Sequence, residues 1–172
     1  KAVNFGIVYG IGAFSLAKDI GVSNREAKRY IESYLAHYSG VDSYMKNVVE
    51  KANADGYVET MFGRRRNLPE LTSSKHMIRA FGERVARNMP IQGTAADIIK
   101  IAMIKVDERM KSENLRARLV LQVHDELIVE APQDESMRVA LIVQEEMENA
   151  VKMSVPLTAD AAIGRTWYDA KG

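Results

Sequence analysis

The residues best suited to chemistry stand at 122–126, where Gln-Val-His-Asp-Glu lies between two apolar runs. The flanking pattern predicts a strand, a turn and a strand over 117–131. Hard divalent cations such as Mg²⁺ take oxygen ligands, usually one or two carboxylates plus substrate phosphates. The acids Asp125 and Glu126 are therefore candidate metal ligands, and His124, whose nitrogens suit Mg²⁺ poorly, is a candidate substrate contact. An exposed acidic turn without a metal is the alternative.

A second set of candidate residues lies in the first ten residues, KAVNFGIVYG. On a helix, Lys1, Phe5 and Tyr9 are four residues apart and share one face. An ammonium group can meet phosphates and aromatic rings can stack on a base, so this face suits a nucleotide. The pattern equally fits a buried aromatic stripe whose lysine reaches out to solvent.

A third set lies in ERVARNMPIQGTAAD, residues 83–97. Here Arg84, Asn88 and Gln92 recur every four residues, although Pro90 is expected to disturb the position of Gln92. Guanidinium and amide donors in a row can reach the purine N3 and pyrimidine O2 acceptors that a minor groove presents at every base pair. This predicts a face that contacts duplex DNA without reading its sequence. The alternative is a polar helix face bonded to neighbouring loops.

The elements that must position these residues are mainly helices. The pattern predicts a capping box at Ser23 and Glu26, and a long helix that kinks or breaks at Pro90. The fold class predicted is α+β, mostly helical, with a small antiparallel sheet that carries the acidic hairpin. The full set of expected elements is helices over 1–9, 23–38, 41–54, 74–89, 94–110 and 133–152, strands over 57–61 and 156–163, a turn or loop over 63–69, and the strand–turn–strand of 117–131.

Composition limits the class of protein. The chain has 172 residues, of which 47% are hydrophobic, enough for a packed core. It has no cysteine, which excludes disulfides and thiolate metal sites and fits a cytoplasmic location. No apolar run approaches the roughly 18 residues of a membrane span, and no signal-peptide pattern opens the chain.

Charge is unevenly distributed along the chain. Residues 64–92 carry seven basic and two acidic groups, whereas residues 122–172 carry four basic and ten acidic groups. This segregation predicts a positive surface for a polyanion beside an acidic region that could hold cations. Two solvated helix faces would account for the same distribution.

Together these motifs resemble the C-terminal part of bacterial family A DNA polymerases, the DNA polymerase I type. KAVNFGIVYG is similar to the second half of the family's fingers-helix motif, Arg-x-x-x-Lys-x-x-x-Phe-Gly-x-x-Tyr-Gly, and QVHDE is similar to its palm motif. The stretches GRRRNLP (63–69) and NMPIQGTAADIIK (88–100) and the final GRTWYDAKG also resemble members of the family. The resemblance covers essentially the whole chain and implies a DNA-directed DNA polymerase, a nucleotidyltransferase of DNA replication and repair.

The resemblance implies roles in nucleotide binding and catalysis. Lys1 would contact the triphosphate, Phe5 would pack against the sugar and base, and Tyr9 would stand near the nascent base pair. Asp125 matches one of two aspartates that bind two catalytic Mg²⁺ ions. Glu126 matches the neighbouring acid, whose part is auxiliary.

The resemblance also implies contacts with primer–template DNA. The residues concerned are Arg84, Asn88 and Gln92 on the segment facing the duplex near the primer end, His124 close to the primer terminus, and Arg64, Arg65 and Arg66 on the DNA backbone. The implied partners are primer–template DNA and deoxynucleoside triphosphates, with no membrane. The parent enzyme is expected to be a monomer, in the bacterial cytoplasm at the nucleoid.

The resemblance divides the chain into a fingers portion, 1–72, and a palm portion, 73–172, with the catalytic hairpin at 117–131. The family's second metal-binding aspartate, and the arginine that opens its fingers motif, would precede Lys1. We therefore expect a piece of a longer polypeptide that, isolated, lacks useful polymerase activity.

Two other classes of function are compatible with parts of the sequence. The first is a non-catalytic module that binds duplex nucleic acid through its basic helix. Lys1, Phe5, Tyr9 and Asp125 argue against it, because binding alone does not need them. The second is a structural fragment or a degenerate relative of a polymerase, and the intact motifs argue against degeneracy.

Overall fold

The computed structural model describes residues 2–171, except for the side chains of residues 2, 5 and 8. The chain forms two compact units, Lys1–Thr94 and Ala95–Gly172, which are described separately below. The predicted α+β class is confirmed, since helices dominate and the strands form antiparallel pairs. The single sheet expected is instead two separate two-stranded sheets.

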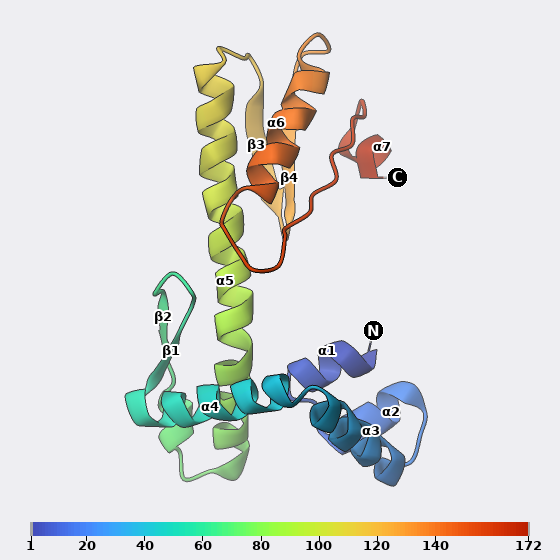
Figure 1. Cartoon of the computed structure of the whole chain (residues 1–172), viewed down its shortest axis with the longest axis vertical. Coiled ribbons are helices and arrows are strands. Elements are labelled where there is room, and N and C mark those ends of the chain that lie inside the picture. The colour runs from blue at the N-terminus through green and yellow to red at the C-terminus, as the bar shows by residue number, and fades with distance from the viewer. Residues whose placement is uncertain (1, 172) are drawn as a thin grey trace. The chain divides into compact units, whose positions relative to one another are not determined.

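Unit 1 is built from helices and one short hairpin (Figure 1). Its elements are α1 (Ala2–Val8), α2 (Ala13–Ile20), α3 (Asn24–His37), α4 (Ser39–Asp55), β1 (Tyr57–Glu59), β2 (Arg65–Asn67), the 3₁₀ helix η1 (Pro69–Thr72) and the first half of α5 (His76–Ser112). Helix α2 was not predicted, because its eight residues are too few to show a clear period.

Local signals explain several helix ends in unit 1. The predicted capping box is confirmed: the Glu26 backbone N–H donates to Ser23 Oγ at 3.3 Å, and the Ser23 N–H donates to Glu26 Oε2 at 3.1 Å. The Ser23 hydroxyl also donates to Glu26 Oε2 at 2.7 Å, and this bond, together with that from the Ser23 N–H, lowers the pKa of the Glu26 carboxyl. At the end of α4, Gly56 has φ 78°, a left-handed conformation that glycine adopts readily.

Unit 1 contains two clusters of buried apolar side chains. One joins α4, the β1–β2 hairpin, η1 and α5, and its buried members are Ala52, Val58, Leu68, Leu71 and Ala86. The other joins α2 and α3 through Leu16, Ala17 and Ala27. Burial of these faces, more than helix propensity, holds the elements in place.

The prediction that Pro90 kinks or breaks the helix is wrong, because α5 runs without interruption from His76 to Ser112. Proline removes one hydrogen bond from the helix ladder. Packing on both sides of the proline offsets that loss, with Ala86 and Met89 in the unit 1 cluster and Val106 in a cluster of unit 2. The four-residue spacing of Arg84, Asn88 and Gln92 is therefore kept.

Unit 2 contains the rest of α5, β3 (Arg118–Val123), β4 (Glu126–Glu130), α6 (Ser136–Glu148) and α7 (Trp167–Lys171) (Figure 1). The strands pair antiparallel from Arg118 with Glu130 to Val123 with Glu126, with an irregularity between Leu119 and Leu121. This confirms the predicted strand–turn–strand. Its core has Val106, Met110, Val139 and Ile142 buried, and Leu119, Leu127 and Val129 of the hairpin pack against it.

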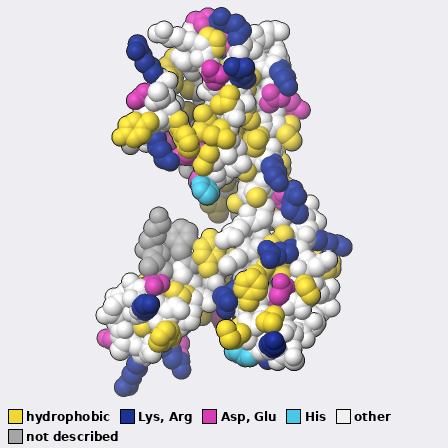
Figure 2. All heavy atoms as spheres, turned by 180° about the vertical axis from the view of Figure 1, so that it is seen from behind, with side chains coloured by type: hydrophobic (Ala, Val, Ile, Leu, Met, Phe, Trp, Pro, Cys, Tyr) yellow, Lys and Arg dark blue, Asp and Glu magenta, His cyan; other side chains and the backbone are white. Residues whose placement is uncertain are grey.

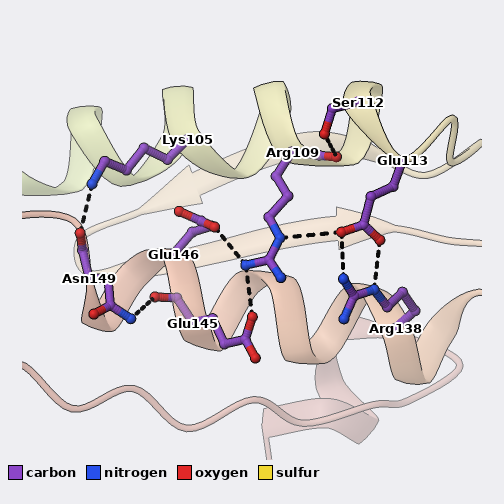
Figure 3. A network of polar contacts seen from close by, with 8 residues as sticks. All are labelled: Lys105, Arg109, Ser112, Glu113, Arg138, Glu145, Glu146 and Asn149. Carbon is purple, nitrogen blue, oxygen red and sulfur yellow. Dashed lines mark hydrogen bonds and ion pairs between the residues drawn. The ribbon is translucent and has the colours of Figure 1, made fainter.

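A polar network ties α5 to α6 beside this core (Figure 3). The Arg109 guanidinium contacts Glu145 and Glu146 at 2.7 Å each, and its Nε donates to Glu113 at 3.3 Å. Glu113 also accepts from Arg138 Nε at 2.6 Å. The hydrogen bonds from Arg138 lower the pKa of the Glu113 carboxyl, and the hydrogen bonds that Arg109 donates to Glu146 and Glu145 raise the pKa of Arg109.

Three further sequence expectations need correction. Residues 65–67 of the expected loop form strand β2, because Arg65, Arg66 and Asn67 pair with β1. The helix expected over 133–152 is shorter, at Ser136–Glu148. Residues 156–163 form no strand. The Ala159 N–H donates to Glu148 Oε1 at 3.1 Å, so a side chain takes the place of a neighbouring strand.

Large hydrophobic side chains stay exposed on both units, and some gather on one face of unit 2 (Figure 2). The exposed hydrophobic side chains of unit 2 include Val120 and Leu121 of β3, which are 50% and 47% exposed. Among residues 2–171, no helix is both long and apolar enough to cross a membrane.

Candidate nucleic-acid interface and metal-binding hairpin

The acidic hairpin places its chemistry on a two-residue turn. His124 and Asp125 connect Val123 of β3 to Glu126 of β4. His124 has φ 53°, as the first position of the primed hairpin turns requires; few residues other than glycine adopt such a φ, and histidine is among those that do so more often. The Gln122 side chain donates to the His124 carbonyl at 2.6 Å and so supports the turn. His124 and Asp125 are both exposed.

The two acids of the turn differ in their surroundings. The Glu126 carboxylate lies 3.6 Å from Lys171 Nζ, and Lys171 also lies over the Trp167 ring at 5.3 Å. Helix α7 therefore supplies a counter-charge for Glu126. Asp125 has no hydrogen bond or ion pair within the described part of the chain. This leaves Asp125 as the carboxylate available to a ligand.

The donor set at the turn fits a hard divalent cation, because it consists of carboxylate oxygens. It supplies only part of a metal site: residues 2–171 contain no cluster of three or more His, Cys, Asp or Glu that could hold an ion. The hairpin thus fits one side of a site that further ligands would complete.

The first candidate face lies partly beyond what the structure describes. Lys1 and the side chain of Phe5 fall outside the described residues. Tyr9 follows α1 and is half-buried. The next residue, Gly10, has φ 76°, and its N–H donates to the Ile7 carbonyl at 2.9 Å. A left-handed glycine therefore follows the end of α1, close to the end expected at residue 9.

The turn at Gly10 brings α1 against α5. A Cβ atom built on Gly10 would lie 3.5 Å from Arg87 Cδ and 4.0 Å from Arg84 Cγ. The first and second candidate motifs, 74 residues apart between Gly10 and Arg84, are therefore neighbours in unit 1. The structure places a basic helix beside the end of the predicted nucleotide helix.

The row of donors on α5 has the predicted spacing. Arg84 and Gln92 are exposed, and Asn88 is half-buried. The Asn88 Oδ1 atom is buried and has no hydrogen-bond partner among residues 2–171. Arg87 instead pairs with Glu83 at 3.2 Å. Arg84 and Gln92 are thus the row's solvent-facing donors.

The three arginines of the GRRRNLP stretch are all exposed but are held differently. Arg65 pairs with Glu59 at 3.3 Å and stacks over the Tyr57 ring at 4.5 Å. The side chain of Arg66 forms no hydrogen bond or ion pair within residues 2–171. It is the arginine of the three most available to a phosphate.

Sequence reasoning missed two features of the site. The contact of Lys171 with Glu126 joins residues 45 positions apart, and no local pattern signals it. The packing of Gly10 on α5 had a signal, because a glycine just past a helix marks a left-handed cap. The element that would lie against it was not predictable.

Comparison with known proteins agrees with these features. The family model described as DNA polymerase family A matches residues 1–169. Over 171 residues, 99% of the chain, it is 54% identical to DNA polymerase I of Bacillus caldotenax and 52% identical to that of Bacillus subtilis.

A solved structure is also similar over 99% of this chain: the POL domain of Pol1 from M. smegmatis, in complex with DNA primer-template and dNTP. It has a TM-score of 0.95 and 46% sequence identity. The chain spans about a fifth of the length of the curated relatives named above, and 30% of that POL domain chain. With a family match across residues 1–169, the chain belongs to DNA polymerase family A.

Proposed function

We propose that this chain is the part of a DNA-directed DNA polymerase that grips the incoming nucleotide and the primer end and supplies one metal-binding carboxylate. The observation that carries the proposal is the packing of Gly10 against Arg84 and Arg87, which joins two predicted substrate-binding elements in one unit. The family match and a relative solved with primer-template DNA and dNTP support it. A duplex-binding module without catalysis is not favoured, because Asp125 and the α1 motif are retained.

The nucleotide is assigned to the face of α1. Lys1 would neutralise the triphosphate, Phe5 would pack on the sugar and base, and Tyr9 would stand by the nascent pair. The position of Tyr9 directly after α1 and beside Gly10 supports this. The DNA is assigned to the α5 row, with Arg84 and Gln92 donating to the duplex near the primer end and Asn88 on the same segment. Arg64, Arg65 and Arg66 are proposed backbone contacts, and His124 a contact at the primer terminus.

The acidic hairpin is assigned to Mg²⁺. Family A DNA polymerases work with divalent metal ions. The exposed, unpaired Asp125 carboxylate and the auxiliary Glu126 would bind there, with other ligands supplied from outside residues 2–171. Such an ion neutralises charge on the transferring phosphoryl group. Lys171 would hold Glu126 to one side, which leaves Asp125 as the principal ligand.

The proposed reaction is attack of the primer 3′-oxygen on the α-phosphorus of a deoxynucleoside triphosphate, with release of pyrophosphate. In such transfers the protein mainly positions the reacting groups and stabilises charge. Here the α5 row would hold the duplex and Lys1 would offset the charge of the leaving phosphates. We assign residues 1–72 to the fingers and 73–172 to the palm of a parent enzyme that is monomeric, cytoplasmic and, like its relatives, bacterial.

The test is primer extension by the full-length protein that carries this segment. Asp125→Asn removes the proposed ligand and should lower the extension rate more than about a hundredfold, because metal stabilisation of the transition state is worth several kcal/mol. Binding of primer–template should change little. The matched control is Asp160→Asn, also an exposed aspartate in unit 2, which should keep both activities.

Normal extension by Asp125→Asn would overturn the metal assignment. Duplex binding by a wild-type protein that never extends a primer would favour the non-catalytic module instead. The 172-residue chain alone, which offers only part of a metal site, should bind primer–template without extending it.

A further inference from the structure

The row of donors on α5 continues beyond Arg84 with apolar residues. Positions 77, 81, 84, 88 and 92 follow one another every three or four residues, so they share one face of the helix. The last three are the donors already assigned to the duplex. Met77 and Phe81 extend the same face by about two turns toward the start of α5.

These two side chains are not part of the core. Met77 is 83% exposed and Phe81 is 45% exposed. The core of unit 1 takes the other face of the helix, where Val85, Ala86 and Met89 pack. Met77 and Phe81 therefore present apolar surface that the core of unit 1 does not cover.

The surroundings of Phe81 are cationic. The Arg84 guanidinium carbon lies 5.9 Å from the centre of the Phe81 ring. The five positions of the row include no acid, and Glu83 beside them is paired with Arg87 at 3.2 Å. The segment 64–92 as a whole carries seven basic and two acidic groups. An exposed ring beside an arginine on a basic surface complements a polyanion that has flat apolar rings.

We propose that Met77 and Phe81 form a platform on which an unpaired base of the template strand stacks. This rests on the proposed function, because it places the platform at the end of the row that holds the duplex. Bases within a duplex are already stacked on both faces, so an exposed ring cannot stack on them without insertion. A base of the single-stranded template ahead of the primer end has a free face, and Arg84 next to the ring can meet its phosphate.

The experiment measures the affinity of the full-length protein for two DNAs: a primer–template with a four-nucleotide 5′ template overhang, and a blunt duplex. Phe81→Ala should weaken binding of the overhang substrate about fivefold or more and leave the blunt duplex within about twofold. Phe81→Tyr keeps the ring and should bind as the wild type does. The matched control is Phe62→Ala, a ring of similar exposure, 47%, at the tip of the β1–β2 hairpin, which should bind both DNAs normally.

A third substrate with abasic overhang positions tests the stacking directly. The wild type and Phe81→Ala should bind this DNA equally, because the base that Phe81 would contact is gone. Equal weakening by Phe81→Ala on all three DNAs would overturn the proposal. A loss of thermal stability in the absence of DNA, without any dependence on the overhang, would instead show that Phe81 packs against another part of the protein. A wild type that binds no primer–template would refute the proposed function itself.

Discussion

Two helical glycines should respond in opposite directions to the same substitution. Gly93 of α5 lies against the β1–β2 hairpin, where a Cβ atom would come 2.7 Å from Thr60 Cγ2 and 3.4 Å from Met89 Cε. Gly40 of α4 has no atom within 4 Å of such a Cβ. Gly93 directly follows Gln92, so its packing also sets the end of the row of donors.

The magnitudes follow from these distances. Alanine in place of glycine stabilises the interior of a helix by up to about 1 kcal/mol. Because Gly40 lies in the first turn of α4, Gly40→Ala should raise the free energy of unfolding by about 0.5 kcal/mol. At Gly93 the contact at 2.7 Å must open by nearly 1 Å toward normal carbon–carbon separation. Thr60 cannot turn away freely, because its Oγ1 accepts from the backbone N–H groups of Phe62 and Arg64 at 3.2 Å each. Overpacking costs about 1–3 kcal/mol, which leaves Gly93→Ala about 1–2 kcal/mol less stable.

Urea denaturation followed by circular dichroism would measure both changes. The double variant Gly93→Ala with Thr60→Ser isolates the cause, because serine lacks the methyl group but keeps the hydroxyl that the hairpin uses. It should recover most of the stability lost in Gly93→Ala. If Gly93→Ala stabilises the protein as Gly40→Ala does, α5 does not pack on Thr60 as described and the reasoning is refuted.

Three further predictions concern the rest of the fold. Ser23→Ala removes the hydroxyl that caps α3 and its hydrogen bond to the Glu26 carboxylate. The free energy of unfolding in urea should fall by about 1 kcal/mol, and an unchanged value would contradict the cap. Glu113→Gln removes a carboxylate whose pKa is lowered, chiefly by Arg138; its stabilising effect is present above the unfolded pKa near 4.5 and is lost as pH falls through the folded value. The wild type should therefore be more stable than this variant at neutral pH, and the difference should vanish at acid pH. Unfolding followed by Trp167 fluorescence at both pH values measures it. Lys171→Ala breaks only an exposed ion pair and should change stability by less than about 1 kcal/mol, whereas a larger loss would show that α7 braces the hairpin.

The elements that sequence predicted well have strong local signals. The capping box at Ser23 and Glu26 and the acidic hairpin each depend on residues within a few positions of one another. In the same way, the spacing of Arg84 and Asn88 could be read from the helix expected over 74–89, whereas Gln92 lay beyond the break expected at Pro90. These features need no knowledge of distant contacts.

The failures involve contacts distant in sequence. Pro90 is tolerated because α5 packs in apolar clusters both before and after it. A rule based only on the local sequence around a proline does not include such packing. Residues 156–163 have a strand-like composition but bond to the Glu148 carboxylate instead of a neighbouring strand. The platform at Phe81 has the same helical spacing as Arg84, yet sequence alone does not distinguish an exposed phenylalanine on a helix from a buried one.

The most direct test of the central claim locates the metal on the chain. In the full-length protein, Fe²⁺ that occupies the metal site in place of Mg²⁺ cuts the nearby backbone when ascorbate and peroxide are added. The fragments can be mapped by mass spectrometry. We predict cleavage at residues 123–126 that Mg²⁺ competes away, that Asp160→Asn retains and that Asp125→Asn loses. Cleavage that persists at the hairpin in Asp125→Asn, or cleavage confined to other parts of the chain, would contradict the account.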